Sequence, residues 1–200
     1  MTTQSATIAP VELAGNGMRW LQLVIGVIGM VMIANCQYGW TFFVPEIQET
    51  FGWDRAAIQI AFTLFETWLV PIEGWFVDKY GPSAVVPFGG VLCGLGWWMT
   101  SHATALGGLN GYYAAMIICG IGAGAVYRTC MGNALKWFPD KRGLAAGLTT
   151  AGFGAGSALT VIPIQSMIAH QGFQSTFLYF GLGQGLIICL CALYLAGWKR

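Results

Sequence analysis

Charged residues are scarce in this sequence. Only 8% of its 200 residues are Asp, Glu, Lys or Arg, whereas 56% are hydrophobic, and the mean hydropathy is +0.64. Soluble domains carry about 25% charged residues, so this chain lacks the polar side chains that would cover a water-facing surface. The composition predicts an integral membrane protein surrounded by a lipid bilayer.

The absence of several sequence motifs excludes further classes of function. The sequence has no basic cluster with interleaved aromatic residues, which argues against a nucleic-acid partner. It has no Gly-x-x-x-x-Gly-Lys-Ser/Thr loop, so any transport would draw its energy from solute or ion gradients rather than from a nucleotide. The two histidines and six cysteines show no metal-ligand spacing, so no metal, cofactor or disulfide framework is expected. We interpret the cysteines as small lipophilic packing residues.

Six apolar segments are each long enough to cross a bilayer as a helix, which takes about 20 residues. They are residues 20–44, 56–77, 84–101, 111–135, 144–169 and 173–197. The loops between them are short, so neighbouring helices are expected to be antiparallel within one bundle. Residues 1–18 are mostly polar or small and lack the pattern of a secretory signal, and we expect a disordered cytoplasmic tail there.

The positive charges predict the orientation of these spans. With a cytoplasmic N-terminus, seven Lys and Arg residues face the cytoplasm, Arg55 lies outside and Arg128 lies within the membrane. The seven are Arg19, Lys79, Lys136, Lys141, Arg142, Lys199 and Arg200. This bias follows the positive-inside rule, and six spans return the C-terminus to the cytoplasm.

Two charged turns face the cytoplasm in this arrangement. The first contains Gly74, Asp78, Lys79 and Gly81, and the second contains Asp140, Lys141 and Arg142. We expect Gly74 to permit close packing at the helix end and Gly81 to make the turn with the proline that follows it. Glycines spaced as Gly-x-x-x-Gly, at residues 120–124 and 152–156, are expected to let helices approach closely in lipid.

The first turn resembles the signature loop between the second and third helices of the major facilitator superfamily. That loop reads Gly-x-x-x-Asp-(Arg/Lys)-x-Gly followed by a basic residue, which Ser83 replaces here. The second turn, together with residues 37–41 and 152–156, resembles the oxalate/formate antiporter family within that superfamily. The resemblance covers residues 19–200, but only the N-terminal half of a twelve-helix family. It implies an all-α membrane protein forming a six-helix half-bundle, with the C-terminal six-helix half absent.

The same resemblance implies a function. The family exchanges small carboxylates such as oxalate and formate, and an alternating-access antiporter or symporter of organic anions in a bacterial inner membrane is expected. Its first-helix Gln-Tyr pair and fourth-helix Tyr line the anion site, which maps onto Gln37, Tyr38 and Tyr127. The two charged turns would act as gating loops. The chain is then a fragment, or a half-transporter that pairs with the missing half or with a second copy.

Arg128 departs from the family pattern, and three interpretations are open: an anion ligand, a structural partner of a carboxylate, or an incidental change. A charge at membrane depth is costly and usually paired, which favours the pair. At 1.5 Å rise per residue, Glu73 matches the depth of Arg128 better than Glu66 does. These two glutamates are seven residues apart and share one helix face. They are candidates for an ion pair, a structural hydrogen bond or proton coupling.

Other function classes are weaker. An intramembrane serine protease would need a histidine near its nucleophile. Ser157 is the candidate nucleophile, but both histidines fall in outer loops, so we predict that the protein is not an enzyme. A six-span channel fits poorly with the two superfamily turns. A non-transporting membrane scaffold remains open because half of the family's fold is missing.

Overall fold

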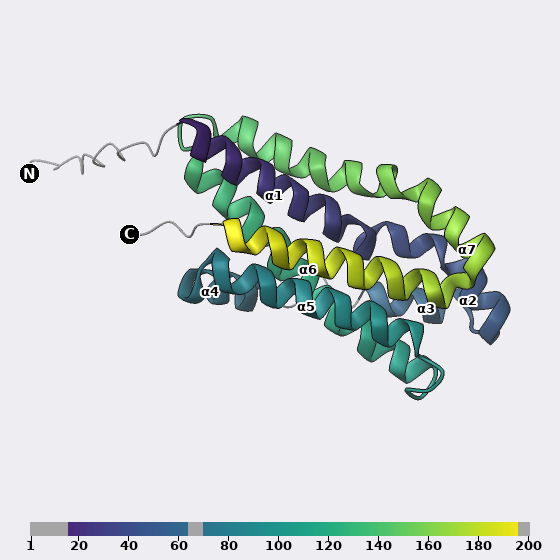
Figure 1. Cartoon of the computed structure of the whole chain (residues 1–200). Helices are drawn as coiled ribbons and strands as arrows, with labels where there is room; N and C mark the ends of the chain where they lie inside the picture. The colour runs from purple at the N-terminus through teal and green to yellow at the C-terminus, as the bar shows by residue number, and fades with distance from the viewer. Residues whose placement is uncertain (1–15, 64–69, 196–200) are drawn as a thin grey trace, which may run out of the picture.

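The computed structural model describes residues 16–63 and 70–195, and within these ranges every regular element is a helix. The long helices lie side by side (Figure 1). In chain order the elements are α1 (Asn16–Gln37), η1 (Gly39–Phe42), α2 (Val44–Phe51), α3 (Arg55–Thr63), α4 (Val70–Tyr80), α5 (Pro82–Ser101), α6 (Leu109–Trp137) and α7 (Arg142–Tyr194). The predicted all-α class is confirmed for the described residues.

By length and composition, four of the described helices can cross a membrane: α1, α5, α6 and α7. Helix α7 has 53 residues, which is about 80 Å if straight and far more than the roughly 30 Å of a bilayer core. It is not straight, because Gly172 has a non-helical backbone (φ 79°, ψ 163°) and the chain reverses there (Figure 1). Only glycine adopts such a conformation readily. The reversal falls within the loop predicted at residues 170–172.

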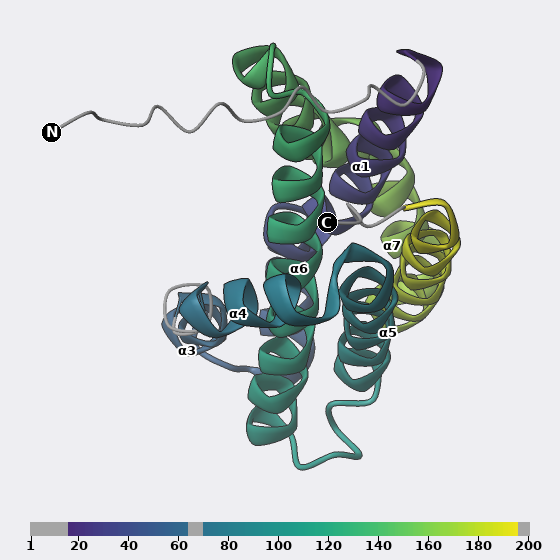
Figure 2. The ribbon, with the colours of Figure 1, turned by 90° about the vertical axis from the view of Figure 1, so that its left-hand side faces the viewer.

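The structure corrects the predicted boundaries of the first two spans. The first helix ends at Gln37, not at residue 44, and the expected loop after it contains α2. A proline in the first turn of α2 and the left-handed Gly52 (φ 67°) at its end bound this short helix, while Val44 and Ile47 are buried. Within the expected second span, the described residues form α3 and α4, and α4 runs crosswise to α6 (Figure 2).

One end of the bundle gathers the elements that carry positive charge. The start of α1, the end of α7, the α4–α5 junction and the α6–α7 turn all lie at this end (Figure 1). We call it the basic end; it carries Arg19, Lys79, Lys136, Lys141 and Arg142. The α5–α6 turn and the reversal of α7 lie at the opposite end.

Glycines set the helix spacing in the rest of the bundle. A Cβ on Gly89 of α5 would lie 2.7 Å from the carbonyl oxygen of Gly122 on α6, and a Cβ on Gly156 of α7 would lie 2.6 Å from Ala34 Cβ on α1. These helices therefore touch backbone to backbone, as small residues permit in lipid. The predicted packing role of residues 152–156 is confirmed. In α6 the backbone also comes close to α5 at Gly122, and the packing role of residues 120–124 stays a prediction.

Candidate functional site

Two of the predicted anion-site residues contact the same aromatic ring. The Phe153 ring of α7 lies 5.4 Å from the Tyr38 ring and 5.2 Å from the Tyr127 ring, measured between centroids. Tyr38 follows directly after α1 and is 45% exposed, whereas Tyr127, on α6, is half-buried. Residues almost 90 positions apart are thus brought together where α1, α6 and α7 meet.

The position of Tyr38 is fixed by the backbone around it. Its N–H donates to the carbonyl of Ala34 at 2.8 Å, which continues the hydrogen bonding of α1 by one residue. Asn35, one turn earlier, is fully buried and accepts a hydrogen bond of 2.6 Å from the Thr160 hydroxyl of α7. This bond ties α7 to the end of α1 where Gln37 and Tyr38 lie. The sequence alone did not single out Asn35, although an amide side chain in an apolar span was a visible signal.

The other predicted site residues occupy neighbouring positions. Gln37 is the last residue of α1 and is half-buried. Arg128 is also half-buried, directly after Tyr127 on α6, and consecutive residues on a helix point about 100° apart. Arg128 and Tyr127 therefore face different directions. Glu66 and the side chain of Glu73 lie outside the described part of the structure, so pairing of either with Arg128 stays a prediction.

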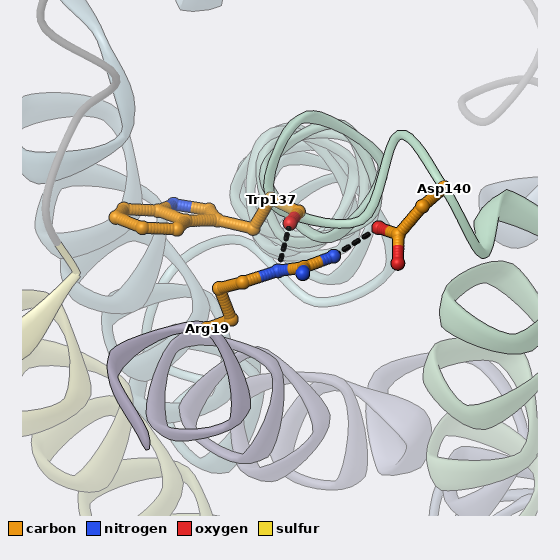
Figure 3. Close-up of polar contacts among 3 residues, drawn as sticks. All are labelled: Arg19, Trp137 and Asp140. Carbon is orange, nitrogen blue, oxygen red and sulfur yellow. Dashed lines mark hydrogen bonds and ion pairs between the residues drawn. The ribbon is translucent and has the colours of Figure 1, made fainter. Parts of the chain in front are cut away.

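At the basic end, Arg19 holds the α6–α7 turn (Figure 3). Its Nε donates to the Trp137 carbonyl at 2.8 Å, and its Nη2 pairs with the Asp140 carboxylate. The guanidinium also lies 4.6 Å from the centroid of the Phe138 ring. The Arg19 side chain is only 9% exposed, so this charge is enclosed by its partners rather than by solvent. The sequence predicted Arg19 as a cytoplasmic charge but not its contacts with the α6–α7 turn.

Behind Arg19, a buried polar chain links three helices. The Trp137 Nε1–H donates to Asn133 Oδ1 at 3.2 Å, and Asn133 Nδ2 donates to Gln22 Oε1 at 3.1 Å. Gln22 Nε2 then donates to the Tyr194 carbonyl at the end of α7, at 2.7 Å. Because each amide is paired through this chain, the polar groups are satisfied where water is scarce.

The Asp140 carboxyl lies outside the membrane-spanning segments, and its pKa is lowered. Desolvation opposes this shift, but hydrogen bonds from its own backbone amide and from Arg19 outweigh it, with help from the charges of Arg19 and Lys141. Asp140 is therefore a stable anion at neutral pH. Lys141 and Arg142, the other charged residues of this turn, are exposed.

The first charged turn contacts the second one weakly. Lys136 Nζ lies 3.9 Å from Asp78 Oδ1, with both side chains more than half exposed. Lys79 Nζ lies 4.5 Å from the centroid of the Trp75 ring. Gly81 makes the turn with φ 76°, as predicted. Among the described residues a Cβ on Gly74 would meet nothing within 4 Å, and the expected close packing there stays a prediction.

Comparison of the sequence with known proteins identifies the family of this chain. The sequence profile described as Major Facilitator Superfamily matches residues 23–198. The chain belongs to the major facilitator superfamily. This membership confirms the resemblance seen in the two charged turns, and it places the chain among transporters rather than among enzymes.

Individual relatives are also transporters by name. The chain is 40% identical to the oxalate:formate antiporter of Oxalobacter formigenes over 88% of its own length and 42% of that protein. It is 25% identical to the MFS-type transporter YhjX of Escherichia coli, covering 82% of this chain and 40% of the relative. The chain is 24% identical to human monocarboxylate transporter 14, over 92% of this chain and 36% of that protein. The chain thus spans less than half the length of these curated relatives.

Proposed function

We propose that this chain is one half of a secondary transporter for small organic anions, with oxalate and formate as the first candidates. The membership in the superfamily and the 40% identity to an oxalate:formate antiporter support this assignment. Transport would proceed by alternating access, as exchange or symport, in a bacterial inner membrane.

The observation that carries the proposal is the aromatic cluster of Tyr38, Phe153 and Tyr127. A planar carboxylate would lie against the aromatic rings while the two phenol hydroxyls and the Gln37 amide donate hydrogen bonds to its oxygens. Neutral donors suit a transported anion, because each hydrogen bond to a charged group is worth only about 1.5–3 kcal/mol and the anion can leave again. In this scheme Arg128, the residue after Tyr127 on α6, would contribute positive charge near the bound anion.

The half-bundle in this proposal has six spanning helices within residues 19–200. Helix α7 would supply the fifth and sixth on either side of Gly172, and α3 with α4 would form the second. The chain would pair with the missing C-terminal half or with a second copy, through an axis along the membrane normal. Residues 1–18 would form the cytoplasmic tail.

The basic end would face the cytoplasm, with both termini on that side, in keeping with the positive-inside rule. Its two turns would be the gating loops that contact the other half. Lys136 and Asp78 already join one turn to the other, at 3.9 Å. Exposed Lys141 and Arg142 would offer charge to the partner. Glu66 and Glu73 would serve as the ion pair or the proton-coupling group of the second span.

The test is anion binding by the chain reconstituted in liposomes. Oxalate should raise the melting temperature of the wild-type chain, and Tyr38→Phe and Tyr127→Phe should each weaken this binding about tenfold through loss of one charged hydrogen bond. Tyr179→Phe is the control, because Tyr179 is an exposed tyrosine on α7. Equal behaviour of all three variants would remove the aromatic cluster from the proposal.

Flux measurements on the same liposomes separate the remaining classes. Counterflow of labelled oxalate would indicate a self-sufficient carrier formed by paired copies. Binding without flux would indicate a half that needs its partner. Flux that does not saturate would indicate a channel. A chain with neither binding nor flux would be a scaffold, and that outcome would overturn the proposal.

A further inference from the structure

Three cysteines that are far apart in the sequence meet in the interior of the bundle. Cys36 of α1, Cys93 of α5 and Cys119 of α6 are all buried, and their Sγ atoms lie within 4.8 Å of one another. Among the described residues, no His, Asp or Glu side chain joins this group. Their sequence spacing predicted no such cluster, since 57 and 26 positions separate successive members.

The close contact of α5 with α6 brings two of these thiols together. A Cβ on Gly96 of α5 would lie 2.6 Å from Cys119 Cβ, and a Cβ on Gly122 of α6 would lie 2.8 Å from the Cys93 backbone nitrogen. The cysteines therefore sit where the backbones almost touch, and α1 adds the third thiol. Because these glycine contacts fix α5 against α6, the sulfur atoms of Cys93 and Cys119 are held in a defined arrangement.

We propose that these three thiols form a site for one soft, thiol-seeking metal ion, and that the ion is Cu(I). Thiolate ligands select Cu(I), zinc or iron–sulfur clusters among biological metals. Zinc in a closed site takes four protein ligands, whereas this group offers three. For a metal–sulfur bond of about 2.3 Å, three sulfur atoms around one ion lie about 4 Å apart, which is compatible with the observed limit of 4.8 Å.

The membrane interior restricts the charge that the site can hold. At 1.5 Å per residue, Cys93 lies about 12 Å and Cys119 about 15 Å from the ends of their helices opposite the basic end. Both are therefore deep in the roughly 30 Å hydrocarbon layer. One of the three cysteines binds as a thiolate and releases its proton, while the other two bind as neutral sulfur donors, so uptake of one Cu⁺ with loss of one proton leaves the net charge unchanged. A monovalent ion thus avoids the cost of a buried net charge.

The chain offers a matched control on the same helix as Cys119. Cys130 is equally buried on α6, but it faces Gly29 of α1, where an added Cβ would lie 3.1 Å from its Sγ. Cys130 therefore lies in the contact between α6 and α1 at Gly29, and not in the three-cysteine group. Substitution of either cysteine by serine removes one buried thiol from α6 and leaves the side-chain shape almost unchanged.

The experiment titrates Cu(I) into the purified 200-residue chain in detergent, under anaerobic and reducing conditions, against the coloured Cu(I) chelator bicinchoninate. The wild-type chain should withhold about one Cu(I) from the chelator and develop thiolate-to-copper absorption in the near ultraviolet. Cys36→Ser and Cys119→Ser should lose this equivalent, and Cys130→Ser should retain it. Retention by Cys119→Ser, or equal loss by Cys130→Ser, would overturn the site.

A second measurement needs no variant and so does not depend on whether each one folds. X-ray absorption at the copper edge of the loaded wild-type chain should show three sulfur neighbours at about 2.3 Å. Failure of the wild-type chain to withhold copper, or a first shell with nitrogen or oxygen neighbours, would refute the proposal. Neither result bears on anion transport, because the cluster shares no residue with Tyr38, Phe153 and Tyr127.

Discussion

Helix α1 meets its neighbours in two different ways along its length. Its first turns are held by polar contacts: Arg19 binds the α6–α7 turn, and Gln22 joins the amide chain that reaches α7. Its later turns are held mainly by close backbone packing, because Gly152 and Gly156 of α7 let the α1 backbone approach closely. These polar contacts lie at the basic end, and the glycine contacts lie within the bundle, where the hydrogen bond from Thr160 to Asn35 adds one polar contact near the end of α1.

The difference follows from the surroundings of each region. Lipid tails are as apolar as leucine, so helices in a membrane gain little from hydrophobic burial and depend on close packing. At the basic end, the last carbonyl groups of α6 need donors, and Arg19 donates to the Trp137 carbonyl as well as pairing with the Asp140 carboxylate. Packing therefore sets the helix spacing, and polar contacts set the shape of the turn that we propose as a gating loop.

Enlarging a glycine in the packed region should have the largest effect on stability. In Gly156→Ala the new methyl group would collide with the Val31 carbonyl and with Ala34, and overpacking of this kind costs about 2 kcal/mol. For a chain of this length we expect the melting temperature in detergent to fall by about 4–8 °C. Gly154→Ala is the control, because a Cβ there meets nothing within 4 Å, and its melting temperature should be unchanged or slightly higher. Equal losses in both variants would show that packing does not set the spacing.

Removing the buried arginine should have the next largest effect. Arg19→Met keeps most of the side-chain volume but leaves the Trp137 carbonyl and the Asp140 carboxylate without their donor. We expect a loss of about 1.5 kcal/mol in the free energy of unfolding. Lys141→Met, an exposed residue of the same turn, should change it by less than about 0.5 kcal/mol. If the two variants were equally stable, the polar end would not depend on Arg19.

Acid should weaken the polar end and leave the packed region unaltered. The pKa of Asp140 is lowered in the folded chain, so its ionised form contributes stability above the ordinary pKa of an aspartate, about 3.9. This contribution is lost as the pH falls through the lowered pKa. The difference in melting temperature between the wild type and Asp140→Asn should therefore be constant at neutral pH and vanish once the pH has fallen below the lowered pKa. The same pH series for Gly156→Ala should show a constant difference.

The contact between the two charged turns should contribute least. Lys136 and Asp78 are 3.9 Å apart and more than half exposed, and exposed ion pairs are worth about 0.5 kcal/mol or less. Lys136→Ala should hardly change the melting temperature of the chain. A decrease as large as that of Arg19→Met would place the Lys136 contact among the polar contacts that shape this end.

Much of the fold followed from the sequence, and the misjudged parts have local causes. The apolar runs gave α5, α6 and the reversal of α7 within a few residues. Helix α2 was missed because its eight residues are short and amphipathic, so they looked like a loop after an apolar span. The family motif singled out Tyr38 and Tyr127, but no spacing rule could place both against Phe153. Asn35 and Arg19 are single polar residues whose partners lie more than 100 positions away.

The sequence by itself determined the class of the protein, its long helices from α5 onward, its family and the positive charge of one end. These properties depend on composition and on patterns within about ten to twenty neighbouring residues, so they do not require tertiary contacts. The tertiary structure alone decided which side chains meet: the two tyrosines around Phe153, Arg19 on the α6–α7 turn, and the three buried thiols. Such contacts depend on how closely glycines let helices approach and on the relative rotation of the helices, neither of which is recorded in any single segment.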